Sequence, residues 1–75
     1  MTKYNGHRSW NAWNISLWIN NDEGLYSTAR SYARQYGIQS GARRFFHECL
    51  EGEKTPDGAS YNPTCVYEAM RDILS

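Results

Sequence analysis

Residues 9–22, with the sequence SWNAWNISLWINND, gather three tryptophans and two isoleucines into a stretch whose only charged residue is its last one. Asparagine residues lie between the large apolar side chains. Whichever regular element this stretch forms, that element has a wide apolar surface to cover. The stretch therefore constrains the fold more than any other part of the chain.

Two interpretations of the stretch are open. In a helix, Ser9 is the N-cap residue. The apolar side chains then form two faces at helical spacing, with Trp10, Trp13, Leu17 and Trp18 on one and Ala12, Ile15 and Ile19 on the other. In a strand, residues 12–19 alternate between apolar and polar side chains, with Trp18 as the exception. We favour the helix because the stretch is long and has a cap, while no partner strand is evident elsewhere in the sequence.

Two further helices are predicted directly after this stretch. Asn21 or Asp22 can cap the first of them, and Gly37 lies where a left-handed residue is expected at its C-terminus. Ser40 is the predicted cap of the next helix, which ends at Gly52. The apolar faces of the two helices are Leu25, Tyr26, Ala29, Tyr32, Ala33 and Tyr36, and then Ala42, Phe45, Phe46, Cys49 and Leu50.

Residues 51–63 contain two prolines and an Asp-Gly pair, and we expect them to form an exposed loop. A last helix then begins at Asn62-Pro63, because proline fits the first helical position. Its inward face is predicted to be Val66, Tyr67, Ala69, Met70, Ile73 and Leu74. The sequence thus predicts a single small domain over residues 1–75, an all-α compact bundle of about four short helices. An α+β fold is the alternative if residues 12–19 form a strand.

Because its basic and acidic residues balance, the chain is not expected to bind a partner through long-range electrostatic attraction. Lys+Arg and Asp+Glu are both eight, so no overall field draws the chain to nucleic acid or to a membrane surface. Two cysteines are too few for a disulfide scaffold. We find neither a secretory signal nor an apolar run long enough to span a bilayer, and we expect a cytoplasmic protein with reduced thiols.

Catalytic and metal-binding patterns have little support. Cys49 and His47 lie two residues apart on a predicted helix and point in nearly opposite directions, so they do not form a nucleophile and base. Cys49 is better explained as a core residue. His7, His47, Cys49 and Cys65 lack the paired close spacings of structural zinc sites. We therefore predict no enzyme, no metal and no cofactor.

A helix-turn-helix within residues 25–51 is the alternative functional hypothesis. Ala33 and Gly37 have the spacing of that motif's small residue and turn glycine. Arg43 and Arg44 would then contact DNA phosphates. Arg43, however, falls where the motif usually buries an aliphatic side chain, and Gly41 leaves the recognition helix short of polar groups.

The aromatic excess favours protein binding over DNA binding. Aromatic residues make up 15% of the chain, and tryptophan, tyrosine and arginine are the residues that dominate binding hot spots. We predict Trp18 and Tyr26 as anchors for a partner, with Arg30 and Arg34 as polar contacts around them. A homodimer would cover the same aromatic surface.

The first third of the chain resembles a family of small proteins of bacteriophages and mobile elements, whose shared pattern is roughly W-N-V-x-L-W-I-x-N-D-E. Ala12 departs from the pattern, because a threonine commonly precedes the second Trp-Asn. The resemblance covers residues 4–26 and rests on Tyr4-Asn5-Gly6, Trp10, Trp13-Asn14-Ile15, Leu17-Trp18-Ile19, Asn20, Asp22-Glu23 and Leu25-Tyr26.

The resemblance implies a biological setting and no particular reaction. Small phage proteins without catalytic groups often bind a host enzyme and block it, with restriction and CRISPR systems as frequent targets. On this analogy we expect a non-catalytic module in the cytoplasm of a bacterial host. Its partner would be a host protein or protein complex, and it would act as a stoichiometric inhibitor of a defence system.

Overall fold

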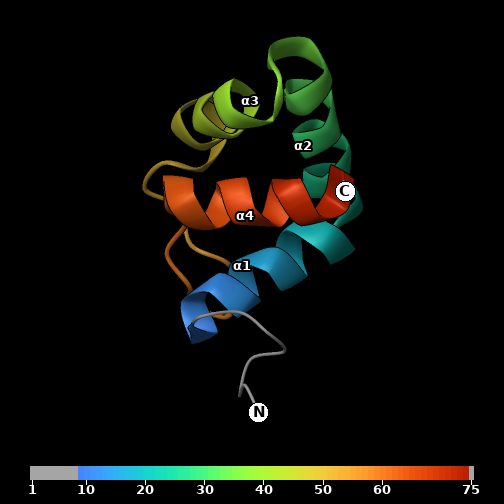
Figure 1. Ribbon diagram of the computed structural model, residues 1–75. Coiled ribbons are helices and arrows are strands. Elements are labelled where there is room, and N and C mark those ends of the chain that lie inside the picture. The colour runs from blue at the N-terminus through green and yellow to red at the C-terminus, as the bar shows by residue number, and fades with distance from the viewer. Residues whose placement is uncertain (1–8, 75) are drawn as a thin grey trace.

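Four α-helices and one π-helical turn follow one another along residues 9–74, the part of the chain that the computed structural model describes (Figure 1). The elements are α1 (Trp10–Asn21), α2 (Glu23–Tyr36), α3 (Ile38–Phe45), the π-helical turn η1 (Phe46–Leu50) and α4 (Pro63–Leu74). The all-α prediction is confirmed, and the strand interpretation of residues 12–19 is wrong. Residues 4–6 of the motif and His7 lie outside the described residues.

Three helices begin with the caps that the sequence predicts. Ser9 Oγ accepts the Ala12 backbone N–H at 3.1 Å at the start of α1, and Asp22 Oδ1 accepts the Leu25 N–H at 2.9 Å at the start of α2. Asn62 Oδ1 accepts the Cys65 N–H at 2.9 Å before α4, whose first residue is Pro63. Each cap satisfies a backbone donor that the first turn of the helix leaves free.

The cap predicted for α3 is wrong. Gly37 alone separates α2 from α3 and has a φ of +84°, so α3 begins at Ile38 and Ser40 lies inside it. A glycine adopts this φ without strain and turns the chain in a single residue. Gly41 then faces α2 so closely that a Cβ there would lie 2.6 Å from the Tyr32 carbonyl oxygen. The corner between the two helices is therefore a contact between backbones.

The end of the third helix also differs from the prediction. Residues Phe46–Leu50 form a π-helical turn, in which the wider spacing of hydrogen bonds shifts the later side chains around the axis. Phe45, Phe46 and Leu50 remain buried, but Cys49 is exposed. The prediction of Cys49 as a core residue is therefore wrong, because it assumed a regular α-helix through residue 50.

The hydrophobic core surrounds α4, which lies across the middle of the molecule between α1 on one side and α2 and α3 on the other (Figure 1). Phe45, Ile15, Ile19, Met70 and Val66 are the largest apolar side chains that are fully buried. Alanines on all four helices fill the spaces between them, which lets the short helices approach closely. Within residues 9–74, no helix has the length and apolar character needed to cross a bilayer.

Residues 51–62 are more than an exposed loop, and that part of the prediction is corrected. Thr55, Ala59 and Tyr61 are buried. The Thr55 N–H donates to the Ala59 carbonyl at 2.8 Å, and Lys54 pairs with Ser60 in an isolated antiparallel bridge. The loop thus folds back on itself and contributes side chains to the core.

Candidate binding surface

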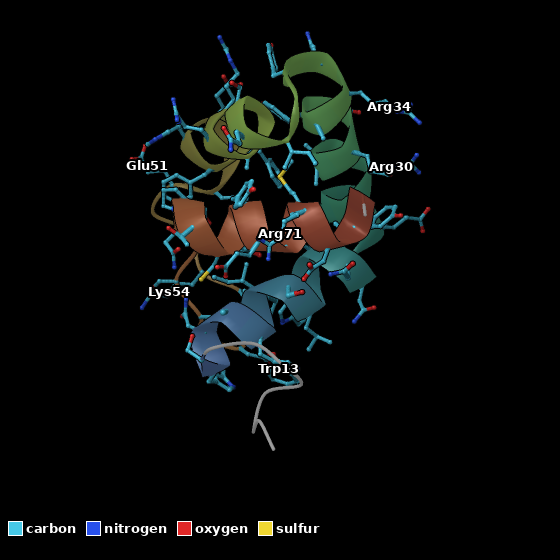
Figure 2. All side chains as sticks on the ribbon, in the orientation of Figure 1. Trp13, Arg30, Arg34, Glu51, Lys54 and Arg71 are labelled. Carbon is cyan, nitrogen blue, oxygen red and sulfur yellow. The ribbon has the colours of Figure 1, made fainter. Side chains whose placement is uncertain are left out.

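The tryptophan stripe of α1 is not the face that enters the core. The buried residues of α1 include Ala12, Ile15 and Ile19, which form the second of the two predicted faces. Trp10 is 40% exposed, while Trp13 and Trp18 are half-buried. Figure 2 shows Trp13 on the side of α1 that points away from α4. The smaller side chains pack inward because they let α1 lie close against α4, and the indoles remain at the surface.

The asparagines of the same stretch hold the loop against α1. Asn11 Nδ2 donates to the Ser60 carbonyl at 3.0 Å, and the Ser60 N–H donates back to Asn11 Oδ1 at 3.1 Å. These two bonds join the side chain of one residue to both backbone groups of another. Asn11 therefore hydrogen-bonds to the backbone of the loop as a neighbouring β-strand would.

Asn14 makes the corresponding contact inside the protein, where it is only 1% exposed. Its Oδ1 accepts the Thr55 hydroxyl at 2.6 Å, and its Nδ2 donates to Asp57 Oδ2 at 2.9 Å. Thr55 Oγ1 in turn accepts the Ala59 N–H at 3.0 Å. The buried amide is satisfied on both sides, as a polar group in a small core must be.

Trp18 completes this contact between helix and loop. Its indole Nε1 donates to the same Asp57 Oδ2 at 2.9 Å. The hydrogen bonds from Asn14 and then Trp18 lower the pKa of Asp57 below its ordinary value of 3.8, because both favour the ionised carboxylate. We call Asn11, Asn14, Trp18 and the loop residues that they bind the α1–loop clamp. The sequence analysis missed this role, since nothing local in residues 11–18 identifies partners in residues 55–60.

The hydrogen bond to Asp57 limits how Trp18 can contact a partner. Its polar atom is already bonded within the chain, so a partner could contact only the exposed part of its ring. No described contact joins Trp18 to the other three residues predicted to bind a partner. Trp10, which the sequence analysis did not select, is the most exposed of the three indoles.

The other predicted binding residues lie together on α2. The Arg30 guanidinium lies over the Tyr26 ring with 5.9 Å between its carbon and the ring centroid, near the outer limit of a cation–π contact. Arg34 follows one helical turn later and is exposed, and both arginines project from the outer side of α2 in Figure 2. Among the described residues, neither arginine has an ion pair with an acidic side chain. We call Tyr26, Arg30 and Arg34 the α2 outer face.

Arg43 and Arg44, the residues of the DNA-binding alternative, point to different neighbours. Arg44 lies over the Tyr36 ring at 4.3 Å and is 3.5 Å from Glu48 Oε2. Arg43 is exposed and lies beside a cleft between α3 and α4. Both side chains also border one shallow depression with Ser40, His47 and Glu48, so they share part of their surroundings although only Arg44 is held by an acidic side chain.

Glu48 also joins Arg44 to a small polar cluster at the surface. The Tyr32 hydroxyl donates to Glu48 Oε1 at 2.6 Å, and it lies 3.6 Å from Cys49 Sγ. The hydrogen bond to Glu48 is the main cause that raises the pKa of Tyr32, because the carboxylate favours the protonated phenol. Cys49 therefore faces a neutral hydroxyl and a nearby negative charge, which is not the electropositive setting of an activated thiolate.

Metal ligation has no support in the described part of the chain. Within residues 9–74, no three histidine, cysteine or acidic side chains are placed so that they could hold an ion together. His47 Nδ1 lies 3.4 Å from Glu51 Oε2, and both side chains are more than half exposed. This pair is one helical turn apart and is a surface contact.

Comparison with known proteins gives a family without a known activity. No curated protein matches the chain, and no solved structure matches it. A family model described as a family of unknown function matches residues 1–75, far beyond the segment 4–26 that carries the motif. The chain belongs to this family, DUF7249.

Proposed function

We propose that this chain is a non-catalytic protein-binding module of phage or mobile-element origin, which binds a host protein and blocks a defence system of the restriction or CRISPR type. The contact surface in this proposal is the α2 outer face. Its partner is a protein that presents acidic side chains to Arg30 and Arg34.

The observation that carries the proposal is that these two arginines have no acidic partner among the described residues. Arg30 lies over the Tyr26 ring at 5.9 Å, and Arg34 follows one helical turn later. An arginine held over an aromatic ring keeps its planar donors directed outward, and it can pair with a carboxylate through two parallel hydrogen bonds. Tyrosine and arginine side by side are also the combination that dominates binding energy at interfaces.

The exposed indole area supports binding through a second surface. Trp10 is 40% exposed, and its neighbour in the stripe, Trp13, is half-buried. Large aromatic side chains at a surface commonly become covered when a partner binds. A second copy of the chain would cover them as well, so the oligomeric state is measured together with binding.

The phage or mobile-element origin rests on the tryptophan-asparagine motif and on analogy with other small proteins of such elements. The charge balance agrees with a protein partner more than with a nucleic acid, because a chain with eight basic and eight acidic residues has no net field to attract phosphates.

The test uses the purified chain and a panel of purified bacterial restriction and CRISPR effector complexes. Binding is measured by biolayer interferometry, and inhibition is measured by DNA cleavage. We expect one member of the panel to bind in a fixed ratio and to lose activity, and we expect the double variant Arg30→Glu/Arg34→Glu to lose most of that binding. Failure of every complex to bind, or equal binding by the double variant, would contradict the proposal.

Lys54→Glu is the matched control for this experiment. Lys54 is an exposed cation on the loop, and Figure 2 shows it on the opposite side of the molecule from Arg30 and Arg34. The substitution reverses one charge without touching the α2 outer face, so it is compared with the single variants Arg30→Glu and Arg34→Glu, which each reverse one charge on that face. It should leave binding unchanged, which separates a local contact from an effect of net charge.

DNA binding through residues 25–51 is the second candidate, and the tight corner at Gly37 favours it. The corner places α3 directly after α2, with Arg43 exposed on α3. A gel shift at several salt concentrations tests this candidate, because phosphate contacts make the affinity fall steeply with ionic strength. The candidate requires a shift at low salt that the double variant Arg43→Gln/Arg44→Gln abolishes.

A further inference from the structure

An open cleft lies between α3 and the first turns of α4, and its walls combine polar and apolar side chains. Its volume is about 300 Å³, and its walls come from Gln39, Ala42, Arg43, Pro63, Thr64 and Tyr67. Figure 1 shows α3 passing over the N-terminal half of α4 at this point. Cavities that hold small ligands begin at about this volume, so the cleft has room for one small molecule.

Arg43 gives the cleft its charge. It is exposed and has neither a hydrogen bond nor an ion pair with another described residue, whereas the adjacent Arg44 is engaged by Tyr36 and Glu48. Successive residues on a helix point about 100° apart, which is why Arg44 reaches Tyr36 and Glu48 while Arg43 borders the cleft toward α4. A guanidinium that no carboxylate of the described residues engages is available to an oxyanion from outside.

The remaining walls supply neutral donors and a flat surface. The Gln39 amide and the Thr64 hydroxyl can each donate a hydrogen bond to an oxyanion. Tyr67 is half-buried, and Arg71 lies over its ring at 5.6 Å, which holds the ring in place beside the cleft. With Ala42 and Pro63, the ring forms an apolar wall against which another flat ring can stack.

We propose that the cleft between α3 and α4 binds a small ligand that carries one oxyanion, a phosphate or a carboxylate, attached to a flat ring. Arg43 holds the oxyanion, and Gln39 and Thr64 hydrogen-bond to it. Tyr67 stacks on the ring. This site is separate from the α2 outer face, so the proposal of a ligand site does not depend on the proposed protein binding.

The experiment is a nuclear magnetic resonance titration of the full chain labelled with nitrogen-15. The probes are adenosine monophosphate, benzoate, adenosine and inorganic phosphate, each at millimolar concentrations. We expect adenosine monophosphate, benzoate or both to shift the amide signals of Ala42, Arg43 and Thr64 in a saturable manner. Adenosine and inorganic phosphate, which each supply one half of the ligand, should bind about tenfold more weakly, since each lacks one set of contacts. Phenyl phosphate, which has the ring of benzoate, separates the two oxyanions: tighter binding than benzoate identifies a phosphate ligand, and weaker binding identifies a carboxylate.

Two variants and one control complete the test. Arg43→Gln should weaken binding about tenfold or more, because a charge-assisted hydrogen bond is lost, and Gln39→Ala should weaken it severalfold. Both positions are exposed, so both variants are expected to fold. Lys54→Gln removes one exposed cation from the loop, away from the cleft, and should leave the affinity unchanged. The proposal is overturned if neither adenosine monophosphate nor benzoate shifts these signals, or if Arg43→Gln and Gln39→Ala both bind as the wild type does.

Discussion

The indole N–H of Trp18 donates a hydrogen bond of 2.9 Å to the carboxylate of Asp57, and the same carboxylate oxygen accepts a second one from Asn14. One acidic side chain of the loop thus joins two residues of α1. The relationship assigns the polar part of the tryptophan-asparagine motif to the fold, and it leaves the ring surfaces of Trp10 and Trp13 for other contacts.

Replacing Asn14 with alanine should destabilise the protein by about 2–3 kcal/mol. The substitution leaves the buried Thr55 hydroxyl without its acceptor and opens a small cavity. Urea unfolding followed by tryptophan fluorescence measures the change. Asn20→Ala is the control, since Asn20 is exposed and, within residues 9–74, bonds only to Ser16 of its own helix. This variant should stay within about 0.5 kcal/mol of the wild type. Similar losses for the two variants would show that the clamp is not a special contact.

The stability of the wild type should fall in acid partly through Asp57. Its pKa is lowered in the folded protein by the hydrogen bonds from Asn14 and Trp18. This contribution is therefore fully present above the ordinary value of 3.8, and it is lost as the pH falls below that value through the folded pKa. The variant Asp57→Asn should show a smaller difference in urea midpoint between pH 6 and pH 3.

Trp18→Phe provides a second check on the same carboxylate. It keeps an aromatic ring and removes the indole donor, so the pKa of Asp57 should move back toward its ordinary value. The dependence of stability on pH should shrink but not disappear, because Asn14 still donates. An unchanged dependence in both variants would mean that other carboxyl groups cause the acid effect.

Replacing Gly41 with alanine should destabilise the protein by about 1–3 kcal/mol. The added Cβ would lie 2.6 Å from the Tyr32 carbonyl oxygen, so α2 and α3 must move apart. The neighbouring substitution Ser40→Ala lies at an exposed helical position and should change stability by less than about 0.5 kcal/mol. Thermal unfolding followed by circular dichroism distinguishes the two, and a neutral Gly41→Ala would contradict the close corner.

The two cysteines should react at very different rates with a thiol reagent. Cys49 is exposed on the π-helical turn, and Cys65 is only 5% exposed on α4. In the native protein we expect one thiol to react rapidly with a disulfide reagent such as Ellman's and the other to react only after unfolding. Cys49→Ser should remove the rapid phase and Cys65→Ser should retain it. If both thiols react slowly, Cys49 is buried, as expected for the regular α-helix that the sequence predicted through residue 50.

Local features of the fold could be predicted from the sequence, and long-range ones could not. The caps at Ser9, Asp22 and Asn62 act within three residues of the helix that they begin, so the residue type and its position identify them. The π-helical turn at Phe46–Leu50 has no such signature, and as a result the exposure of Cys49 was missed.

The same distinction holds for the candidate site. Residue type selected Tyr26, Arg30 and Arg34 as partner contacts, whereas helical spacing assigned Tyr26 to the apolar face. The structure leaves Tyr26 half-buried, with Arg30 over its ring. Spacing could not predict that Asp57 accepts a hydrogen bond from the indole N–H of Trp18, because that bond joins residues from distant parts of the chain. The cleft beside Arg43 was missed for the same reason, since α3 and α4 supply its walls together.

The α1–loop clamp can form only late in the synthesis of this chain. Asn11 and Asn14 leave the ribosome early, but their partners Ser60 and Thr55 emerge more than forty residues later. Until then, the amide groups of the first helix have only water to bind, and Ile15 and Ile19 lack the surface of α4. Contacts so distant in sequence form late and cost loop-closure entropy. The newly made N-terminal segment, with its indoles, therefore remains open to chaperones until most of the chain has been translated.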